Sequence, residues 1–429
     1  MRVPEERLAR RIGLFDSTMV VMGGIVGSGI FVTPAIVASW TSTREEMIGA
    51  WIAGGGAALL GAFIYAGLSR RRPFAGGQYV YLREAYHPAV GFMYGWALLL
   101  VIQTGGMAVC AMTFGRYFRQ LAGIAVADGV LAALGIGILT VVNCLGVGAG
   151  ARVQSALMVL KIVAITALIA AGLAGAPSAA PETVKGGTSF AAALVPVLFS
   201  YGGFQTACFV AGEMKDPGRD LPRALVTGVL GVIALYVGVA FACDRVLGKA
   251  ALEHSTAPAM DVATRVFGAR GAALIGAGVA VSSLGFLSQS ILTAPRVYFA
   301  MAEDGAFLRG LARVHPRTRA PVAAIALQGA VAIALALAGT YEVLLRYVVA
   351  IDFIFFALVA SCLFVFQARG EPISMPGHPL TTLLFIGVCA AVVISTFARD
   401  PVHALIGLAL TLAGLPVYLL WRRSDERLR

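Results

Sequence analysis

Charged side chains are scarce in this sequence, and their scarcity excludes an ordinary soluble domain. Only 13% of the 429 residues are Asp, Glu, Lys or Arg, whereas a soluble globular domain carries about 25%. Hydrophobic residues make up 59% of the chain, and the mean hydropathy is +0.85. The composition therefore predicts an integral membrane protein.

Cysteine and histidine are also few, and they are dispersed along the chain. The six cysteines form no CxxC pair, and the five histidines lie in loops or at the ends of apolar runs. This spacing indicates neither a disulfide framework nor a metal site. The sequence also lacks a Walker loop, a GxSxG elbow and an HExxH motif. We therefore expect no enzyme activity, no cofactor and no metal.

Twelve long apolar runs fill the chain, and most approach the roughly 20 residues that a helix needs to cross a bilayer. The first run follows a charged arm without a small-residue cleavage site, so no cleaved leader is expected. The sequence predicts one all-α transmembrane domain over residues 1–429. The runs lie near 13–37, 47–68, 89–115, 123–145, 153–175, 190–211, 223–247, 270–301, 321–339, 343–367, 380–397 and 402–421.

Basic residues are concentrated on one side of these runs. If both ends are cytoplasmic, the inner loops and tails hold 22 of the 33 Lys and Arg residues. The positive-inside rule therefore favours an even number of crossings with both termini in the cytoplasm. This bias explains most of the net charge of +11. Because the arginines flank the spans and build no groove, we expect no nucleic-acid partner.

Glycines interrupt two of the apolar runs, at residues 24–31 in the first and 199–204 in the sixth. A glycine in a helix costs about 1 kcal/mol relative to alanine. Backbone at membrane depth must also satisfy its own hydrogen bonds, unless it is buried in protein or lines a cavity. Breaks at corresponding places in two halves of five segments indicate the substrate site of a transporter.

The broken stretches offer backbone groups that suit a zwitterion. Unwinding in the first run frees the N–H groups of Ser28 and Gly29 at the start of a half-helix, whose positive dipole end suits a carboxylate. Freed carbonyls near Ile25, Phe199 and Ser200 are suited to accept hydrogen bonds from an ammonium group. Together these atoms predict a clamp for an α-amino acid.

A second interpretation of the glycines stays open. Gly23, Gly24 and Gly27 can instead let neighbouring helices pack closely through a small-xxx-small seam. The matching pair Gly202 and Gly203 in the sixth run favours the substrate site for Gly27 and the glycines that follow it.

Two ionisable residues lie inside apolar runs, where such groups are costly and usually functional. Lys161 is about midway along the fifth run, and Asp352 is about ten residues into the tenth. The alternative for Lys161 is an ammonium group that snorkels to the interface. Asp352 either pairs with Arg346 or a backbone N–H, or it serves proton coupling or binds a substrate ammonium group.

Four motifs follow one another in the order of a known superfamily: Gly27-Ser28-Gly29-Ile30-Phe31 with Pro34, residues 73–79, residues 213–222 and residues 296–305. With them the chain resembles the amino acid–polyamine–organocation (APC) superfamily, in the branch of L-amino-acid transporters and their bacterial relatives. The resemblance covers most of the chain. It implies an inverted repeat of segments one to five and six to ten, with segments one and six broken, plus two appended helices.

The resemblance also implies roles for individual residues. Phe204 corresponds to an aromatic gate over the substrate, and Tyr236 to a tyrosine that bonds to the unwound part of segment one. In sodium-coupled relatives a cation bridges segments one and eight, and in this branch a segment-five lysine, here Lys161, supplies that charge. The implied partners of Lys161 are carbonyls near Gly23 or Gly24 and the hydroxyls of Ser282 or Ser283.

Two further expectations concern the loops. Animal relatives join a glycoprotein subunit through a cysteine in the second outer loop; residues 116–129 contain none, so no disulfide-linked partner is expected. On the cytoplasmic side, four charged residues should form an inner salt-bridge gate or a loop brace: Glu213, Asp216, Arg296 and Asp304.

These observations predict a transporter of the bacterial inner membrane that moves small or medium neutral L-amino acids by alternating access, without sodium. Exchange, uniport and proton symport are not separable from the sequence. One alternative is a carrier of cationic amino acids or polyamines, for which Asp352 is the candidate acidic group. Another is a sensor that binds an amino acid on the same scaffold without transporting it.

Overall fold

The computed structural model describes residues 8–178, 189–338, 341–373 and 375–426. Over these ranges the chain is helical, and its one extended pairing is an isolated bridge between Ile12 and Met214. Nine of the described helices are long and apolar enough to cross a membrane, and three shorter apolar helices accompany them. The prediction of an all-α membrane protein with twelve apolar segments is confirmed.

The first five segments are formed by α1 (Leu14–Ile25) with α2 (Thr33–Trp40), α3 (Arg44–Arg71), α5 (Pro88–Ala97) with α6 (Gln103–Ala122), α7 (Asp128–Cys144) and α8 (Val147–Ala174). The next five are α9 (Phe190–Ser200) with the 3₁₀ segment η3 (Phe204–Glu213), α10 (Pro217–Leu247), α13 (Ala269–Thr293) with α14 (Pro295–Glu303), α15 (Val322–Ala338) and α16 (Tyr341–Ala368). The last two are α17 (Leu380–Arg399) and α18 (Pro401–Leu412) with α19 (Gly414–Glu426).

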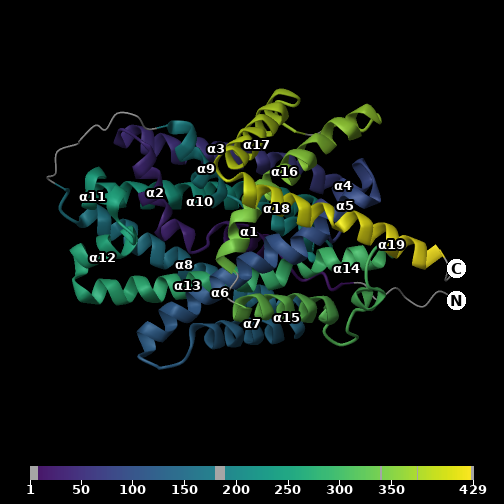
Figure 1. Ribbon diagram of the computed structural model, residues 1–429, viewed down its shortest axis with the longest axis horizontal. Helices are drawn as coiled ribbons and strands as arrows, with labels where there is room; N and C mark the ends of the chain where they lie inside the picture. Colours follow the sequence, from purple (N-terminus) through teal and green to yellow (C-terminus); the bar gives the residue numbers. More distant parts are fainter. Residues whose placement is uncertain (1–7, 179–188, 339–340, 374, 427–429) are drawn as a thin grey trace.

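The long helices run roughly parallel to one axis, and short helices gather at the two ends of the bundle (Figure 1). One end holds α2 with α11 (Lys249–His254) and α12 (Pro258–Phe267). The other end holds α4 (Gln78–Ala85), α14 and α19. We call these the α2 end and the α4 end.

Both predicted breaks are present in the structure. Helix α1 ends at Ile25, because Val26 is extended (φ −76°, ψ 94°), and the chain resumes as a 3₁₀ turn, Gly29–Phe31, that leads into α2. Helix α9 ends at Ser200, and Gly203 adopts a positive φ of 105° before η3 begins. At Gly203 only glycine takes this conformation without strain.

The first break lies at the centre of the bundle. Helix α1 contacts α8, α10, α13 and η3, so its broken end is enclosed by the fifth, sixth, seventh and eighth segments. Helices α17 and α18 pack against α16 and against each other, and not against α1. This packing places the unwound backbone where neighbouring side chains can satisfy its polar groups, as a membrane interior requires.

Candidate functional site

A cavity of about 440 Å³ lies between the two breaks. Its walls come from the α1–α2 break, from α6, from the α9–η3 break and from α16. Val32, Ile36 and Phe199 line it and are about 40% exposed, so the cavity is open toward the α2 end. The predicted site residues among its lining are Ile25, Gly27, Ser28, Gly29, Phe199, Ser200, Gly202, Gly203, Tyr236 and Asp352.

Three consecutive carbonyls at the first break are each met by a side chain from a different helix. In an unbroken helix these carbonyls would accept from N–H groups four residues further along. Here the donors are Tyr236 Oη of α10 to Ile25 (3.0 Å), Lys161 Nζ of α8 to Val26 (2.6 Å) and Ser282 Oγ of α13 to Gly27 (3.0 Å). The break is thus held open by the fifth, seventh and eighth segments together.

Lys161 is 1% exposed, and it is absent from the lining of the cavity. Gly285 of α13 makes room for it, because a Cβ there would lie less than 3.0 Å from the ammonium nitrogen and its neighbouring carbon. Its carbonyl partner is Val26, and the expectation of Gly23 or Gly24 was wrong. Those glycines face Gln154 and Gly203, which leave no space for the lysine.

The two serines of α13 differ in what they bind. Ser282 donates to the first break, as described above. Ser283 instead donates to the carbonyl of Val279 in its own helix (2.9 Å), so it does not join the group around Lys161. Successive residues point about 100° apart around a helix, so two adjacent serines do not face the same neighbour.

The N–H of Gly29 has no acceptor among the described residues, whereas the N–H and the hydroxyl of Ser28 are hydrogen-bonded to the thiol of Cys110 in α6. Both residues line the cavity, and Gly29 is exposed in it. A Cβ at Gly29 would meet only the Thr33 hydroxyl, at 3.7 Å, so the missing side chain leaves cavity space. The geometry suits an anion held by backbone donors at the start of a half-helix.

Gly24 and Gly203 serve a different purpose from Gly29. A Cβ at either position would lie less than 3.0 Å from the carbonyl of the other. The first and sixth segments therefore touch through their backbones just beside the cavity. Close packing accounts for these two glycines, whereas the glycine at position 29 faces open space.

Several polar groups at the second break are bonded to neighbours in the chain. The Phe199 carbonyl accepts from Gly202 N–H (3.0 Å), and the Ser200 hydroxyl donates to the Pro196 carbonyl (2.8 Å). The Gly203 carbonyl accepts from the hydroxyl of Thr206 (2.6 Å). Of the three carbonyls predicted to receive an ammonium group, those of Ile25 and Phe199 therefore already have a donor, and the Ser200 carbonyl accepts none of these bonds.

Phe204, the predicted aromatic gate, is 2% exposed and does not line the main cavity. Its ring stacks on Phe356 (centroids 5.9 Å apart) and contacts the edge of Tyr65 (5.6 Å). The exposed aromatic ring that the second break brings to the cavity is that of Phe199. The sequence did contain a signal for it, because Phe199 lies in the last turn of α9 before the break.

Asp352 lines the cavity, and it is the one formally charged side chain among the described lining residues. No hydrogen bond or ion pair of Asp352 is present in the described part of the chain. The side chain of Arg346, its predicted alternative partner, lies outside the described residues.

The α4 end of the bundle is closed by buried polar contacts. Arg296 of α14 and Glu213 of η3 form a two-bond ion pair (2.7 and 3.0 Å) in which both side chains are fully buried. The arm before α1 covers this pair, because the Ile12 N–H donates to the Glu213 carbonyl and the Lys215 N–H donates to the Ile12 carbonyl. Removing one member of a buried ion pair typically costs about 3–5 kcal/mol.

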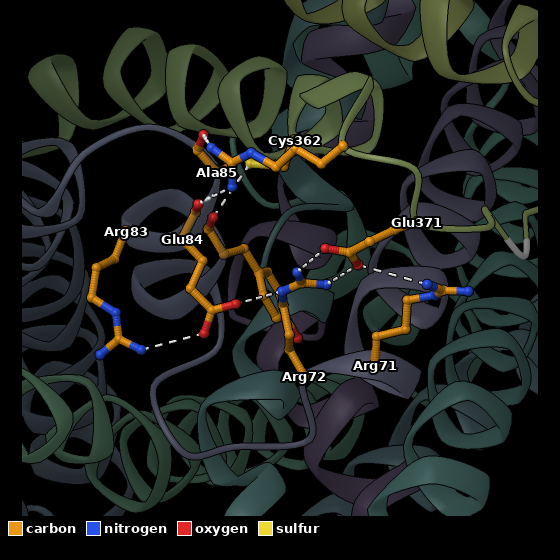
Figure 2. Close-up of polar contacts among 9 residues, drawn as sticks. Arg71, Arg72, Arg83, Glu84, Ala85, Cys362 and Glu371 are labelled. Atoms are coloured by element: carbon orange, nitrogen blue, oxygen red, sulfur yellow. Dashed lines mark hydrogen bonds and ion pairs between the residues drawn. The ribbon is translucent and has the colours of Figure 1, made fainter. Parts of the chain in front are cut away.

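The loops at this end carry a second, partly exposed ionic group, in which Arg72 lies between two glutamates (Figure 2). Arg72 donates to Glu84 of α4 (2.6 Å) and, through two bonds, to Glu371 in the loop after α16 (2.7 and 2.9 Å). Asp304 accepts from Arg83 and Tyr79 of α4. Asp216, which was grouped with Asp304 from the sequence, instead caps α10 by accepting from the Arg219 N–H.

We expect the Arg72–Glu371 contact to add a small, acid-sensitive stabilisation. The hydrogen bond from Arg72 lowers the pKa of Glu371 below its ordinary value of 4.5 against an opposing effect of burial, and the charges of Arg72 and Arg71 lower it further. A lowered folded-state pKa stabilises the protein above pH 4.5, and this contribution is lost as the pH falls through the lowered value. Glu371→Gln should therefore reduce stability at pH 7 by at most about 1 kcal/mol, since the pair is partly exposed.

Thermal unfolding of the two proteins in detergent checks this expectation. The difference between wild type and Glu371→Gln should be present at pH 7 and should shrink on acidification below about pH 4. A difference that stays constant, or that grows in acid, would show that Glu371 acts other than through the charge of its carboxylate.

A helical membrane bundle in which two broken segments meet at a central cavity defines a multi-pass transporter. The chain belongs to the amino acid permease family, whose model matches residues 12–415. It is 32% identical to the serine/threonine exchanger SteT of Bacillus subtilis over 97% of this chain and 98% of that relative. It is 28% identical to the human large neutral amino acids transporter small subunit 2 and 26% identical to the mouse Asc-type amino acid transporter 1, in each case over 98% of this chain. The alignments cover 82% and 83% of those two relatives.

These similarities confirm the resemblance to the APC superfamily and the prediction of an amino-acid transporter that is not an enzyme. Both the family match and the alignments run through the two breaks and the motifs between them. The cavity therefore lies in the part of the chain that the whole family shares.

Proposed function

We propose that this protein moves small or medium neutral L-amino acids across the bacterial inner membrane by alternating access, without sodium. The observation that carries the proposal is the first break. The free N–H of Gly29 faces the cavity, and the N–H of Ser28 beside it is held only by the thiol of Cys110. Tyr236, Lys161 and Ser282 satisfy the carbonyls of the same break. A substrate carboxylate fits the N–H groups, and the apolar walls suit an uncharged side chain.

The relatives support the substrate class. They include a serine/threonine exchanger and a transporter of large neutral amino acids, and both align over nearly all of this chain. Lys161 of α8 supports sodium independence. Its ammonium group already supplies a positive charge between the broken end of α1 and Gly285 of α13. In this proposal the lysine performs the structural task of a bound cation.

The arrangement of charges supports a topology with both termini in the cytoplasm. The basic loops then lie at the α4 end, on the inside, which agrees with the positive-inside rule. The cavity opens toward the α2 end, so in this orientation the structure represents an outward-facing state with the Glu213–Arg296 side closed. Residues 116–129 contain no cysteine, and we propose that the carrier works without a disulfide-linked subunit.

Counterflow into proteoliposomes that hold the purified protein tests this function. Vesicles are loaded in turn with unlabelled serine, alanine, leucine, arginine or putrescine, and uptake of the same labelled compound is followed against empty liposomes. We expect uptake of the neutral amino acids. Uptake restricted to arginine or putrescine would instead show a cationic carrier, and saturable binding without uptake would show a sensor.

A further inference from the structure

Asp352 is unusual among the described cavity residues because its carboxyl group has no partner within the protein. Val348, Asp352 and Phe356 follow one another at intervals of four residues, so they lie along one face of α16. All three line the cavity, and Phe353 adds a further aromatic ring beside the carboxylate. The carboxyl group is therefore placed in an apolar wall.

A carboxylate in such a wall is costly unless donors meet its oxygens. Within the described residues Asp352 has neither a hydrogen bond nor an ion pair. Lys161 does not supply one, because its ammonium group donates to Val26 at the first break and is absent from the cavity lining. The Asp352 oxygens are thus available to water or to a bound molecule.

The position of Asp352 in the cavity separates it from the predicted clamp. The N–H groups of Ser28 and Gly29 belong to the α1–α2 break, whereas Asp352 belongs to α16, which packs on α3, α4 and α6. In the proposed clamp the substrate carboxylate lies at the first break, and the Ser200 carbonyl at the second break is left to accept from the ammonium group. The one substituent that remains is the side chain. Asp352 is placed on a different wall, where that side chain can reach it.

We propose that Asp352 accepts a hydrogen bond from a donor group on the substrate side chain. The transporter then favours side chains with a hydroxyl or a cationic donor over apolar side chains of the same shape. A site built to bond a donor rejects an analogue that lacks it much more strongly than an apolar pocket rejects an extra methylene group. This inference rests on the proposed function, because it requires that the cavity binds an amino acid.

Competition between matched substrates tests the proposal. Threonine and valine have nearly the same shape and differ in the hydroxyl group, as serine and alanine differ by one. We expect unlabelled threonine to compete with labelled alanine at a concentration at least about tenfold lower than valine does, since bonds to charged groups are the stronger ones. In Asp352→Leu this preference should fall to less than about threefold through loss of threonine affinity, with valine unchanged.

Two further variants make the test specific. Asp352→Asn retains an acceptor without the charge and should keep part of the preference for threonine. Val348→Ala changes the same face of α16 one turn away, so it should alter threonine and valine alike. Lysine and ornithine are tested separately. If wild type prefers them and Asp352→Asn abolishes this preference, the donor on the substrate is a cation. If Asp352→Asn still prefers threonine over valine, the donor is a neutral hydroxyl group.

Other outcomes would overturn the proposal. Equal loss of threonine and valine in Asp352→Leu would show that the carboxylate binds the common α-ammonium group or supports packing. Wild-type protein that prefers neither threonine over valine nor lysine and ornithine over apolar side chains would also refute it, while leaving amino-acid transport intact. If wild type transports no amino acid at all, the proposed function itself fails. To separate binding from flux and folding yield, the same ratios are also measured as ligand-dependent shifts of the unfolding temperature in detergent.

Discussion

Replacing Lys161 by alanine is expected to reduce the initial rate of amino-acid counterflow at least tenfold. The ammonium group of Lys161 donates to the Val26 carbonyl over 2.6 Å and is buried against Gly285. Without it, a freed carbonyl at membrane depth loses its donor, and α1, α8 and α13 lose the charge between them. The N–H groups of Ser28 and Gly29 follow directly in the chain, so the clamp should lose its shape.

A second lysine variant serves as the control, because it shows whether the loss of a lysine elsewhere in the chain also slows transport. Lys215 is exposed in the loop between η3 and α10, and Lys215→Ala should transport at close to the wild-type rate. Both variants should elute as monodisperse protein in detergent. Near-normal flux in Lys161→Ala would contradict the role of the lysine as a resident cation.

Replacing Gly203 by alanine should destabilise the whole fold, by about 3 kcal/mol or more. The positive φ of 105° is strained for any side chain, and the added Cβ would lie less than 3.0 Å from the Gly24 carbonyl. Strained backbone and overpacking each cost about 1–3 kcal/mol. The expected result is a fall in unfolding temperature and in monodisperse yield.

Two other glycines supply the controls for this prediction. Gly56 is exposed in α3 with nothing within 4 Å of a Cβ, so Gly56→Ala should leave stability unchanged or raise it by up to about 1 kcal/mol. Gly29→Ala should also fold normally, since its Cβ meets only Thr33 at 3.7 Å, yet it should weaken substrate binding. If Gly203→Ala unfolds at the same temperature as Gly56→Ala, the backbone contact between the breaks does not stabilise the fold.

The parts of the site that the sequence predicts well are those that follow from backbone chemistry. Glycines in apolar runs mark the breaks at Val26 and Gly203, because an unwound helix in a membrane needs both conformational freedom and a cavity. Lys161 stands out because an ammonium group at that depth requires a partner. Tyr236 and Ser282 follow from the family resemblance, and each does bond to the first break.

The parts that the sequence does not predict depend on how each helix is rotated. Which carbonyl Lys161 reaches is decided by the packing of Gly23 and Gly24 against other helices, and no pattern in the chain shows this. For the same reason the sequence did not show that Phe199, and not Phe204, lines the cavity. The turn at residues 201–203 changes which residues face it. Ser283 was likewise indistinguishable from Ser282 before the orientation of α13 was known.

The claim at the centre of this interpretation is that a buried lysine replaces a bound cation, so that transport needs no sodium. The most direct measurement is the initial rate of serine counterflow in wild-type proteoliposomes, with sodium chloride replaced on both sides by choline chloride at the same ionic strength. We predict the same rate in the two salts. A rate that rises severalfold with sodium, and that saturates as the sodium concentration increases, would contradict the claim.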